Sequence, residues 1–280
     1  MLQKAFAPMS KDLREVFAQH INLDDPKLKE KYEKRNKQKV LDYTEENSRN
    51  KAAIVWEHSL WSSAPIKFTF ADWKPNERQN TNKAKELGNK AFTLAKGIQT
   101  KAFNVVMSGD AGVGKTSLAL AMLYQLKGAG KRVMFVSTSE LMHLVSEQYR
   151  YQDRAKELED VKRAMCECDV LLLDDFGAEG GSIKKINSGD FTGVRRDMQS
   201  LIYDVANARY EGTWREQKAA VKAGKKLPKP VRSTIVTTNN QTGELELIYD
   251  KRTVSRLISK NPEHRLAFND MEDMRPEEGL

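Results

Sequence analysis

Apolar residues in the second part of the chain gather in four short runs, 103–107, 133–137, 170–173 and 233–237. Each run has the length of a buried strand, and the segments between the runs are long enough for helices. Strands that alternate with helices form a parallel sheet with helices packed against it. The pattern therefore predicts an α/β fold for this part of the chain.

The first part of the chain has a different pattern. Residues 1–64 are polar, charged and poor in glycine, and Ser10, Asp24, Asp25 and Pro26 are residue types that begin helices. We expect a small helical N-terminal domain. Two interpretations of it stay open: a solvated spacer helix, or an adaptor that docks on a partner protein.

A domain boundary is expected near residue 65, where the pattern of apolar and polar residues changes. Over residues 66–73 apolar and polar positions alternate as in a strand or an extended edge. The second domain is expected to span 65–280. Within it, the segment 213–230 carries many lysines and two prolines between a helix and a strand. We predict an inserted basic surface loop there.

Composition narrows the function classes only modestly. The net charge of +8 and the pI of about 9.2 suit a polyanionic partner, although basic surfaces that bind nothing are common. The two cysteines, Cys166 and Cys168, provide neither a disulfide framework nor four zinc ligands. No long apolar run or secretory signal is present, so we expect a cytoplasmic protein that does not enter a membrane.

A glycine-rich segment carries the strongest chemical signal. Residues 109–116, GDAGVGKT, follow an apolar strand and open the helix predicted over 117–126. Backbone N–H groups of such a loop surround phosphates, the lysine places a positive charge on them, and the hydroxyl binds Mg²⁺. A purely structural turn is the alternative. We expect phosphate contacts from Gly109, Gly112, Val113, Gly114, Lys115, Thr116 and Ser117, with Thr116 also a metal ligand.

Polar side chains follow two further strands. Asp174 and Asp175 end the run 170–173; a carboxylate there can hold Mg²⁺ and another can act as a base. We assign the metal to Asp174 and the catalytic base to Asp175. Asn239, after the run 233–237, is placed to sense the terminal phosphate or to position water. Solvated turns are the plainer interpretation of both segments.

Several motifs occur together in one order: GDAGVGKTSLA, LLLDDFGAE, IVTTN, RTVSRL and NDMEDMR. In this combination the chain resembles the bacterial and phage helicase loaders of the DnaC and DnaI type over most of residues 66–280. Transposition helper ATPases of the IstB type have nearly the same ATPase motifs. The resemblance implies an AAA+ fold, ATP with Mg²⁺, and a homo-oligomer in which nucleotide lies between neighbouring subunits.

The resemblance also assigns roles to single residues. Arg256 in RTVSRL matches the family's arginine finger, and Arg252 lies one helical turn before it; a salt-bridged helix face is the alternative. Arg275 matches the second sensor, which reaches the phosphates of its own chain, and Asn239 matches the first. Asp175 stands where glutamate is usual in AAA+ proteins, which suggests slow hydrolysis.

Partners follow from the same resemblance. Related loaders grip single-stranded DNA with the segment after the second motif, where this chain has Lys184, Lys185, Arg195 and Arg196. Cations there would neutralise backbone phosphates without reading sequence, although a plain surface loop is the alternative. The family's N-terminal region binds the helicase, which favours the adaptor interpretation of residues 1–64.

Three functions are compatible with these motifs. The leading hypothesis is an ATP-dependent loader that places a replicative helicase on single-stranded DNA. The nearest rival is a transposition helper ATPase that binds duplex DNA and a transposase. A small-molecule P-loop kinase is the third, since the phosphate loop alone does not separate phosphoryl transfer from hydrolysis.

Overall fold

The computed structural model describes residues 26–180, 194–225 and 231–274, and only the backbone of residues 26–29 and 31. The chain divides into two units, residues 1–51 and 52–280. Helix α3 (Pro26–Glu57) begins in the first unit and ends in the second. Pro26 is therefore a helix start, whereas Ser10, Asp24 and Asp25 lie outside the described residues. The predicted boundary near residue 65 stays a prediction.

The described part of the first unit is a solvated helix. Every side chain from residue 32 to residue 51 is exposed. Contacts one turn apart support the helix, as between Gln38 and Asp42 (2.8 Å) and between Arg49 and Glu45 (3.5 Å). Since a helix that is polar on all sides has no face to bury, this stretch of α3 contributes no core.

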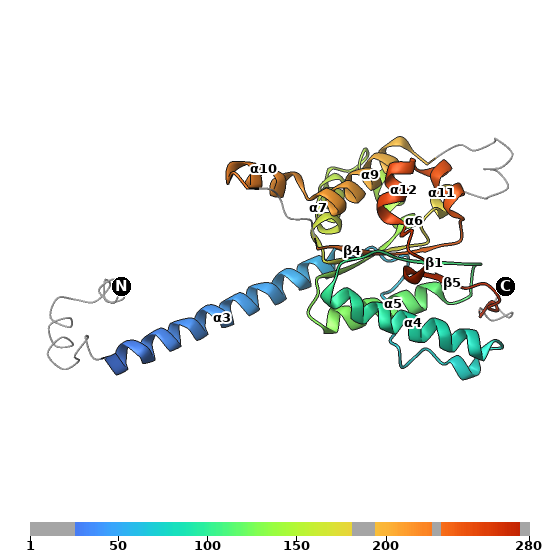
Figure 1. Ribbon diagram of the computed structural model, residues 1–280. Coiled ribbons are helices and arrows are strands. Elements are labelled where there is room, and N and C mark those ends of the chain that lie inside the picture. The colour runs from blue at the N-terminus through green and yellow to red at the C-terminus, as the bar shows by residue number, and fades with distance from the viewer. Residues whose placement is uncertain (1–25, 181–193, 226–230, 275–280) are drawn as a thin grey trace. The chain divides into compact units, whose positions relative to one another are not determined.

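The second unit is built on a five-stranded sheet with the order β2-β3-β4-β1-β5 (Figure 1). Every neighbouring pair is parallel. The strands are β1 (Val105–Ser108), β2 (Val133–Ser137), β3 (Val170–Asp174), β4 (Ser233–Thr238) and β5 (Arg265–Ala267). The predicted α/β class and the four predicted strands are confirmed. The short β5, which carries too few residues to give a pattern, was not predicted.

Helices cover both faces of the sheet, as Figure 1 shows. Alternate strand residues enter two separate apolar cores: Met134 and Leu171 in one, Phe135 and Leu172 in the other. The first core is closed by α6 (Thr138–Glu147), α7 (Gln152–Glu167), α9 (Arg196–Glu211), α11 (Thr242–Ile248) and α12 (Lys251–Leu257). The second is closed by α4 (Thr81–Thr100) and α5 (Lys115–Gly128). Short 3-10 turns are η1 (Pro75–Glu77), η2 (Ala178–Gly180) and η3 (Pro262–His264).

The edge of the sheet beside β2 is occupied by Leu60. Its N–H and C=O pair with Phe135 O and Ser137 N, both at 2.9 Å, and the Trp61 ring stacks on Phe135 at 4.0 Å. Residues 66–73, for which a strand or an extended edge was predicted, contain no strand; the short pairing with β2 is made by Leu60 instead. Phe68, Phe70 and Trp73 pack in the core closed by α4 and α5, where the Phe70 ring meets Phe92 of α4 at 5.2 Å, whereas Ile66 is 53% exposed.

A surface loop was predicted for the segment 213–230, but the structure has a helix in part of it. Helix α10 (Trp214–Lys222) occupies its first half, and residues 226–230 lie outside the described residues. A capping box begins the helix: the Thr213 hydroxyl accepts from the Glu216 N–H and the Glu216 carboxylate accepts from the Thr213 N–H. The capping box stabilises the start of a helix in a segment whose many lysines and two prolines had suggested irregular structure.

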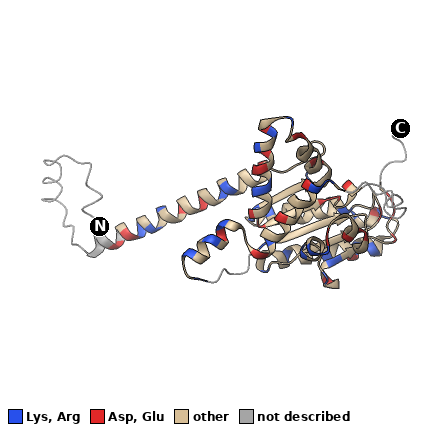
Figure 2. Cartoon of the chain, turned by 90° about the horizontal axis from the view of Figure 1, so that it is seen from above, with Lys and Arg blue, Asp and Glu red and all other residues tan. Residues whose placement is uncertain are grey.

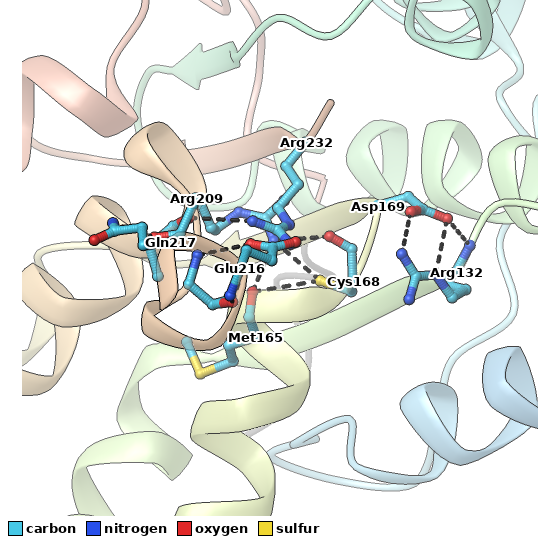
Figure 3. A network of polar contacts seen from close by, with 11 residues as sticks. Arg132, Met165, Cys168, Asp169, Arg209, Glu216, Gln217 and Arg232 are labelled. Atoms are coloured by element: carbon cyan, nitrogen blue, oxygen red, sulfur yellow. Dashed lines mark hydrogen bonds and ion pairs between the residues drawn. The ribbon is translucent and has the colours of Figure 1, made fainter. Parts of the chain in front are cut away.

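A buried arginine ties α9 to the amino-terminal ends of β3 and β4 (Figure 3). The Arg209 guanidinium donates to the carbonyl oxygens of Met165 (2.7 Å), Cys168 (3.0 Å) and Ser233 (2.5 Å) and to the Thr234 hydroxyl (3.0 Å). These contacts satisfy a charged group that would be costly to bury without partners. They fix the end of α9, from which α10 departs.

Both cysteines are free thiols. Burial raises the pKa of Cys166 to about 11 and also raises the pKa of Cys168, so both stay protonated near neutral pH. Among the described residues there is no group of three or more His, Cys, Asp or Glu side chains able to hold a metal ion. None of the described helices is both long and apolar enough to cross a membrane.

Candidate functional site

The glycine-rich segment is the turn between β1 and α5, as predicted. Gly109, Gly112 and Gly114 have φ angles of +149°, +80° and +96°, which favour glycine because it has no Cβ. Gly114 is the residue before α5, so the loop delivers the chain directly into the helix N-terminus. Backbone N–H groups at such a turn form a site for phosphate.

Lys115 is the first residue of α5 and is almost fully buried, with 5% of its surface exposed. Its ammonium group donates to the carbonyl oxygens of Gly109 (2.9 Å) and Asp110 (2.6 Å) and to Oδ1 of Asn239 (2.6 Å). The structure thus brings together Lys115 and Asn239, which are 124 residues apart. Their contact places the predicted sensor amide at the phosphate loop.

Asp174 receives two hydroxyl groups at the carboxyl end of β3. Oδ1 accepts from Thr116 Oγ1 at 2.9 Å and from Thr237 Oγ1 at 2.7 Å. Burial raises the pKa of Asp174 to about 6, and the neighbouring Asp175 carboxylate adds to this, although the two threonine hydrogen bonds act in the opposite direction. A divalent cation on this carboxylate would compensate the negative charge that burial disfavours.

Asp175 lies beside this carboxylate but faces solvent. Its backbone has a φ of 53°, which is unusual for a residue other than glycine, and its N–H donates to Thr237 Oγ1 at 2.9 Å. The turn therefore exposes the Asp175 side chain while Asp174 stays buried. The two neighbouring carboxylates consequently have different environments, in keeping with the different roles predicted for them.

These residues fit ATP with Mg²⁺. A hydroxyl and a carboxylate 2.9 Å apart are ligands of the kind that Mg²⁺ takes beside a bound phosphate. The loop also borders a hollow of about 510 Å³ at the carboxyl ends of β1 and β4, lined by Ser108, Asp110, Asn239 and Arg265 among others. The hollow gives solvent access to the phosphate loop from that side.

Residues 273 and 274 lie against the phosphate loop. The resemblance had implied that the neighbouring Arg275 reaches the phosphates, but the contacts of Asp273 and Met274 were not predicted. The Met274 N–H donates to Gly112 O at 3.1 Å. A Cβ atom at Gly112 would stand 1.8 Å from the Asp273 carboxylate, so that carboxylate occupies the space a side chain would need. An acidic group therefore contacts the loop that is proposed to hold phosphates.

Trp73 and Arg78 form the opposite flank of the loop and were also missed. A Cβ atom at Gly114 would lie 3.0 Å from the Trp73 ring and 3.4 Å from an Arg78 guanidinium nitrogen. The Arg78 guanidinium lies 4.7 Å from the centre of the Trp73 ring. Burial lowers the pKa of Arg78, and the Glu272 carboxylate opposes this effect. The segment before α4 thus contributes a cation to the site.

A second group of polar residues links β3 to the segment before α12. The Glu179 carboxylate accepts from the Tyr249 hydroxyl, from Thr138 Oγ1 (2.9 Å) and from the Gly177 N–H (3.1 Å). Thr138 Oγ1 also lies 3.0 Å from Asp175 O. Burial of the carboxyl group raises the pKa of Glu179. No sequence motif indicated this connection.

The two arginines of α12 differ in their surroundings. Arg256 donates to Glu211 at 3.0 Å, and its guanidinium lies 5.5 Å from the Tyr210 ring centre. The side chain of Arg252 is exposed and has no hydrogen bond or ion pair with another described residue. Within this chain, Arg256 is thus part of a salt-bridged helix face, which was the alternative to an arginine finger. Arg252 is accessible from solvent.

The predicted DNA contacts are only partly within the described residues. Arg195 pairs with Asp197 at 2.8 Å and lies over the Tyr149 ring, and Arg196 is exposed at the start of α9. Lys184 and Lys185 lie outside the described residues, as does the predicted second sensor, Arg275.

Comparison with known proteins gives a match to one family model. Residues 60–188 match the model described as IstB-like ATP binding protein. An insertion sequence IS21 putative ATP-binding protein of Pseudomonas aeruginosa is 29% identical over 108 residues, which are 39% of this chain and 34% of that protein. The aligned stretch thus spans about a third of that relative's length.

Two solved structures of helicase loaders are also similar. A DnaC helicase loader has a TM-score of 0.46 and 17% identity, over 76% of this chain and 97% of that one. DnaI has a TM-score of 0.46 and 16% identity, over 74% and 92%. Both kinds of protein that the motifs resemble are thus among those to which this chain is similar.

Proposed function

We propose that this chain is an AAA+ ATPase that binds ATP with Mg²⁺ at the phosphate loop between β1 and α5. The observation that carries the proposal is the meeting of Lys115 with Asn239 at 2.6 Å beside the Thr116–Asp174 pair at 2.9 Å. When bound, Mg²⁺ neutralises phosphate charge and fixes the phosphate oxygens.

The side chains of the site have separate roles in this proposal. Thr116 and Asp174 hold the metal, and Lys115 supplies positive charge to the phosphates. Asp175, exposed beside them, accepts the proton of the attacking water, and Asn239 orients that water. A carboxylate one methylene shorter than glutamate has less reach toward the water. Slow hydrolysis, suited to a switch, is the expected consequence.

Hydrolysis is proposed to need a neighbouring subunit. Arg252 is exposed and therefore accessible to a second copy of the chain. Arg256 is held by Glu211, so its use as a finger requires that this ion pair exchange for a phosphate on assembly. An arginine supplied in this way stabilises the charge that develops in the transition state.

The proposed biological role is the ATP-dependent loading of a replicative DNA helicase onto single-stranded DNA. The order of the motifs from the phosphate loop to NDMEDMR supports it. So does the exposed helix of the first unit, where Leu41 and Tyr43 are 56% and 71% exposed and available to a partner. Residues 1–64 would then be the adaptor, and Arg195, Arg196, Lys184 and Lys185 would contact the DNA backbone.

Co-purification of the full chain with the replicative helicase of its host, in the presence of ATP and Mg²⁺, tests this role. Leu41→Ser/Tyr43→Ser should release the helicase, whereas Lys37→Gln/Lys39→Gln should not. A truncation that tests the adaptor should remove only residues 1–51, because Val55, Leu60 and Trp61 pack within the second unit. Failure of the full chain to retain any helicase would contradict the loader role.

A transposition helper ATPase is the second candidate, favoured by the IstB-like match and by the IS21 relative. The matched residues, 60–188, contain the phosphate loop and Asp174, which both kinds of ATPase need. The same pull-down with a transposase and duplex DNA in place of the helicase separates the two candidates. Retention of the transposase but not of the helicase would favour this one.

A further inference from the structure

Helix α10 projects from the junction of α9 and β4 and is fastened along one side. The Glu216 carboxylate accepts from Arg232 at 2.6 Å, and Arg232 also donates to Ala208 O at 3.2 Å. Gln217 Nε2 donates to Gly212 O at 2.9 Å. With the capping box at Thr213, these contacts hold α10 against the end of α9, which the buried Arg209 fixes in turn (Figure 3). The helix is therefore a built element with a defined orientation.

The opposite side of α10 is open to solvent and carries a consistent set of side chains. At 100° per residue, residues 214, 215, 218, 221 and 222 lie within an arc of about 120° around the helix axis. Trp214 and Val221 are 69% and 81% exposed, and the helix buries no residue at all. We call these side chains the α10 stripe: Trp214, Arg215, Lys218, Val221 and Lys222, each of them exposed.

All the charged side chains of the α10 stripe are cationic: Arg215, Lys218 and Lys222. Figure 2 draws its Lys and Arg positions in blue. Glu216, the acidic residue of the helix, lies on the fastened side, where the Arg232 hydrogen bond helps to lower its pKa although burial raises it. The Lys218 ammonium lies 4.7 Å from the centre of the Trp214 ring. The stripe thus presents three cations and one indole on the same side of the helix, with no carboxylate among them.

We propose that the α10 stripe binds single-stranded nucleic acid. Arg215, Lys218 and Lys222 would contact backbone phosphates, and the exposed Trp214 ring would stack on one base. This combination binds unpaired strands without reading sequence, since every base has a face for stacking. The short helix presents only two apolar side chains on this face. A membrane-binding helix needs a broad apolar face, so a membrane is disfavoured.

The stripe is separate from the proposed ATPase site and does not depend on it. None of its residues belongs to the phosphate loop, to Asp174 and Asp175, or to the segment 184–196 for which DNA contacts were predicted. Binding by the stripe is therefore expected without nucleotide. A loss of oligonucleotide binding at α10 is distinguishable from a loss of ATP turnover or of helicase binding.

Fluorescence anisotropy of a labelled oligothymidylate with the full chain, without nucleotide, tests the proposal. Lys218→Gln/Lys222→Gln should weaken binding and lower the slope of log affinity against log salt by roughly 1.4, or 0.7 for each phosphate contact. Trp214→Ala should weaken binding roughly 5- to 150-fold, and Trp214→Phe should restore most of it. Lys85→Gln/Lys101→Gln, with the same loss of charge at two exposed lysines of α4 and its end, should bind as the unaltered chain does.

Two results would overturn the proposal. One is equal affinity and equal salt slope for the Lys218→Gln/Lys222→Gln variant and the unaltered chain. The other is binding of phosphatidylserine vesicles that this variant loses while oligothymidylate binding persists, which would assign the stripe to a membrane. Because all substituted side chains are exposed, unchanged thermal unfolding should accompany either result.

Discussion

At the scale of single residues, Lys115 and Asp174 have the most hydrogen-bond partners within the site. Lys115 is buried among carbonyl oxygens and the Asn239 amide, while Asp174 accepts two hydroxyl groups. Each has one partner from outside the loop and its helix: Thr237 belongs to β4 and Asn239 directly follows it. The nucleotide site thus depends on the sheet that places these partners, and not on the phosphate loop alone.

Asp273 gives a prediction at this scale. Its carboxylate contacts the loop at Gly112, where it opposes the approach of phosphate anions. Asp273→Asn should therefore tighten ATP binding, by roughly two- to fivefold because solvent screens this exposed side chain. Titration with a fluorescent ATP analogue measures the effect. Asp270→Asn, which removes an exposed carboxylate three residues earlier, is the matched control. Equal gains in both variants would show a general charge effect.

At the scale of elements, Glu179 connects three parts of the fold. It accepts hydrogen bonds from Thr138, where α6 begins, from Gly177 after β3, and from Tyr249 between α11 and α12. The Tyr249 ring also stacks on Phe176 at 4.7 Å. Since α12 carries Arg252 and Arg256, these contacts join the end of β3 to the helix proposed to face a neighbouring subunit.

The raised pKa of Glu179 predicts a pH dependence of stability. The folded chain keeps a proton that the unfolded chain releases near the ordinary pKa of 4.5. The free energy of unfolding should therefore fall as pH rises above about 4.5, until Glu179 is ionised in the folded state as well. Glu179→Gln, neutral at every pH, should gain stability relative to the unaltered chain between about pH 5 and about pH 8.

Urea denaturation of the Glu179→Gln variant and of the unaltered chain, at about pH 5 and at about pH 8, measures this difference in the free energy of unfolding. Glu159→Gln, at an exposed position of α7, is the control and should show no such pH-dependent gain. A stability difference between Glu179→Gln and the unaltered chain that is constant with pH would contradict this account of the buried carboxylate.

At the scale of the whole molecule, assembly is the first matter to test. Arg256→Ala should lower the rate of ATP turnover at high protein concentration by on the order of a thousandfold, while ATP binding persists. Lys251→Ala, on the same helix, should retain turnover. If Arg252→Ala abolishes turnover and Arg256→Ala does not, the exposed arginine is the finger and the Arg256–Glu211 pair is structural. Unchanged turnover in both variants would remove the assignment to α12.

Much of the fold and of the site was predictable from the sequence because its signals are local. The strand runs, the phosphate loop and Asp174 are each contained in a few consecutive residues. The contact of Asp273 with Gly112 depends instead on the path of the chain after the three-residue β5. The pairing of Glu179 with Tyr249 joins residues 70 positions apart and likewise has no local signal. For α10 a signal existed, since Thr213 and Glu216 have capping-box spacing.

The central claim is that Lys115, Thr116, Asp174 and Asp175 form an ATPase site. Its most direct test is to measure ATP binding and Mg²⁺-dependent hydrolysis on the same preparations of the unaltered chain, Lys115→Ala and Asp175→Asn. The account predicts that Lys115→Ala loses binding, whereas Asp175→Asn binds ATP but does not hydrolyse it. Full hydrolysis by Asp175→Asn, or ATP binding that is unaffected by Lys115→Ala, would contradict it.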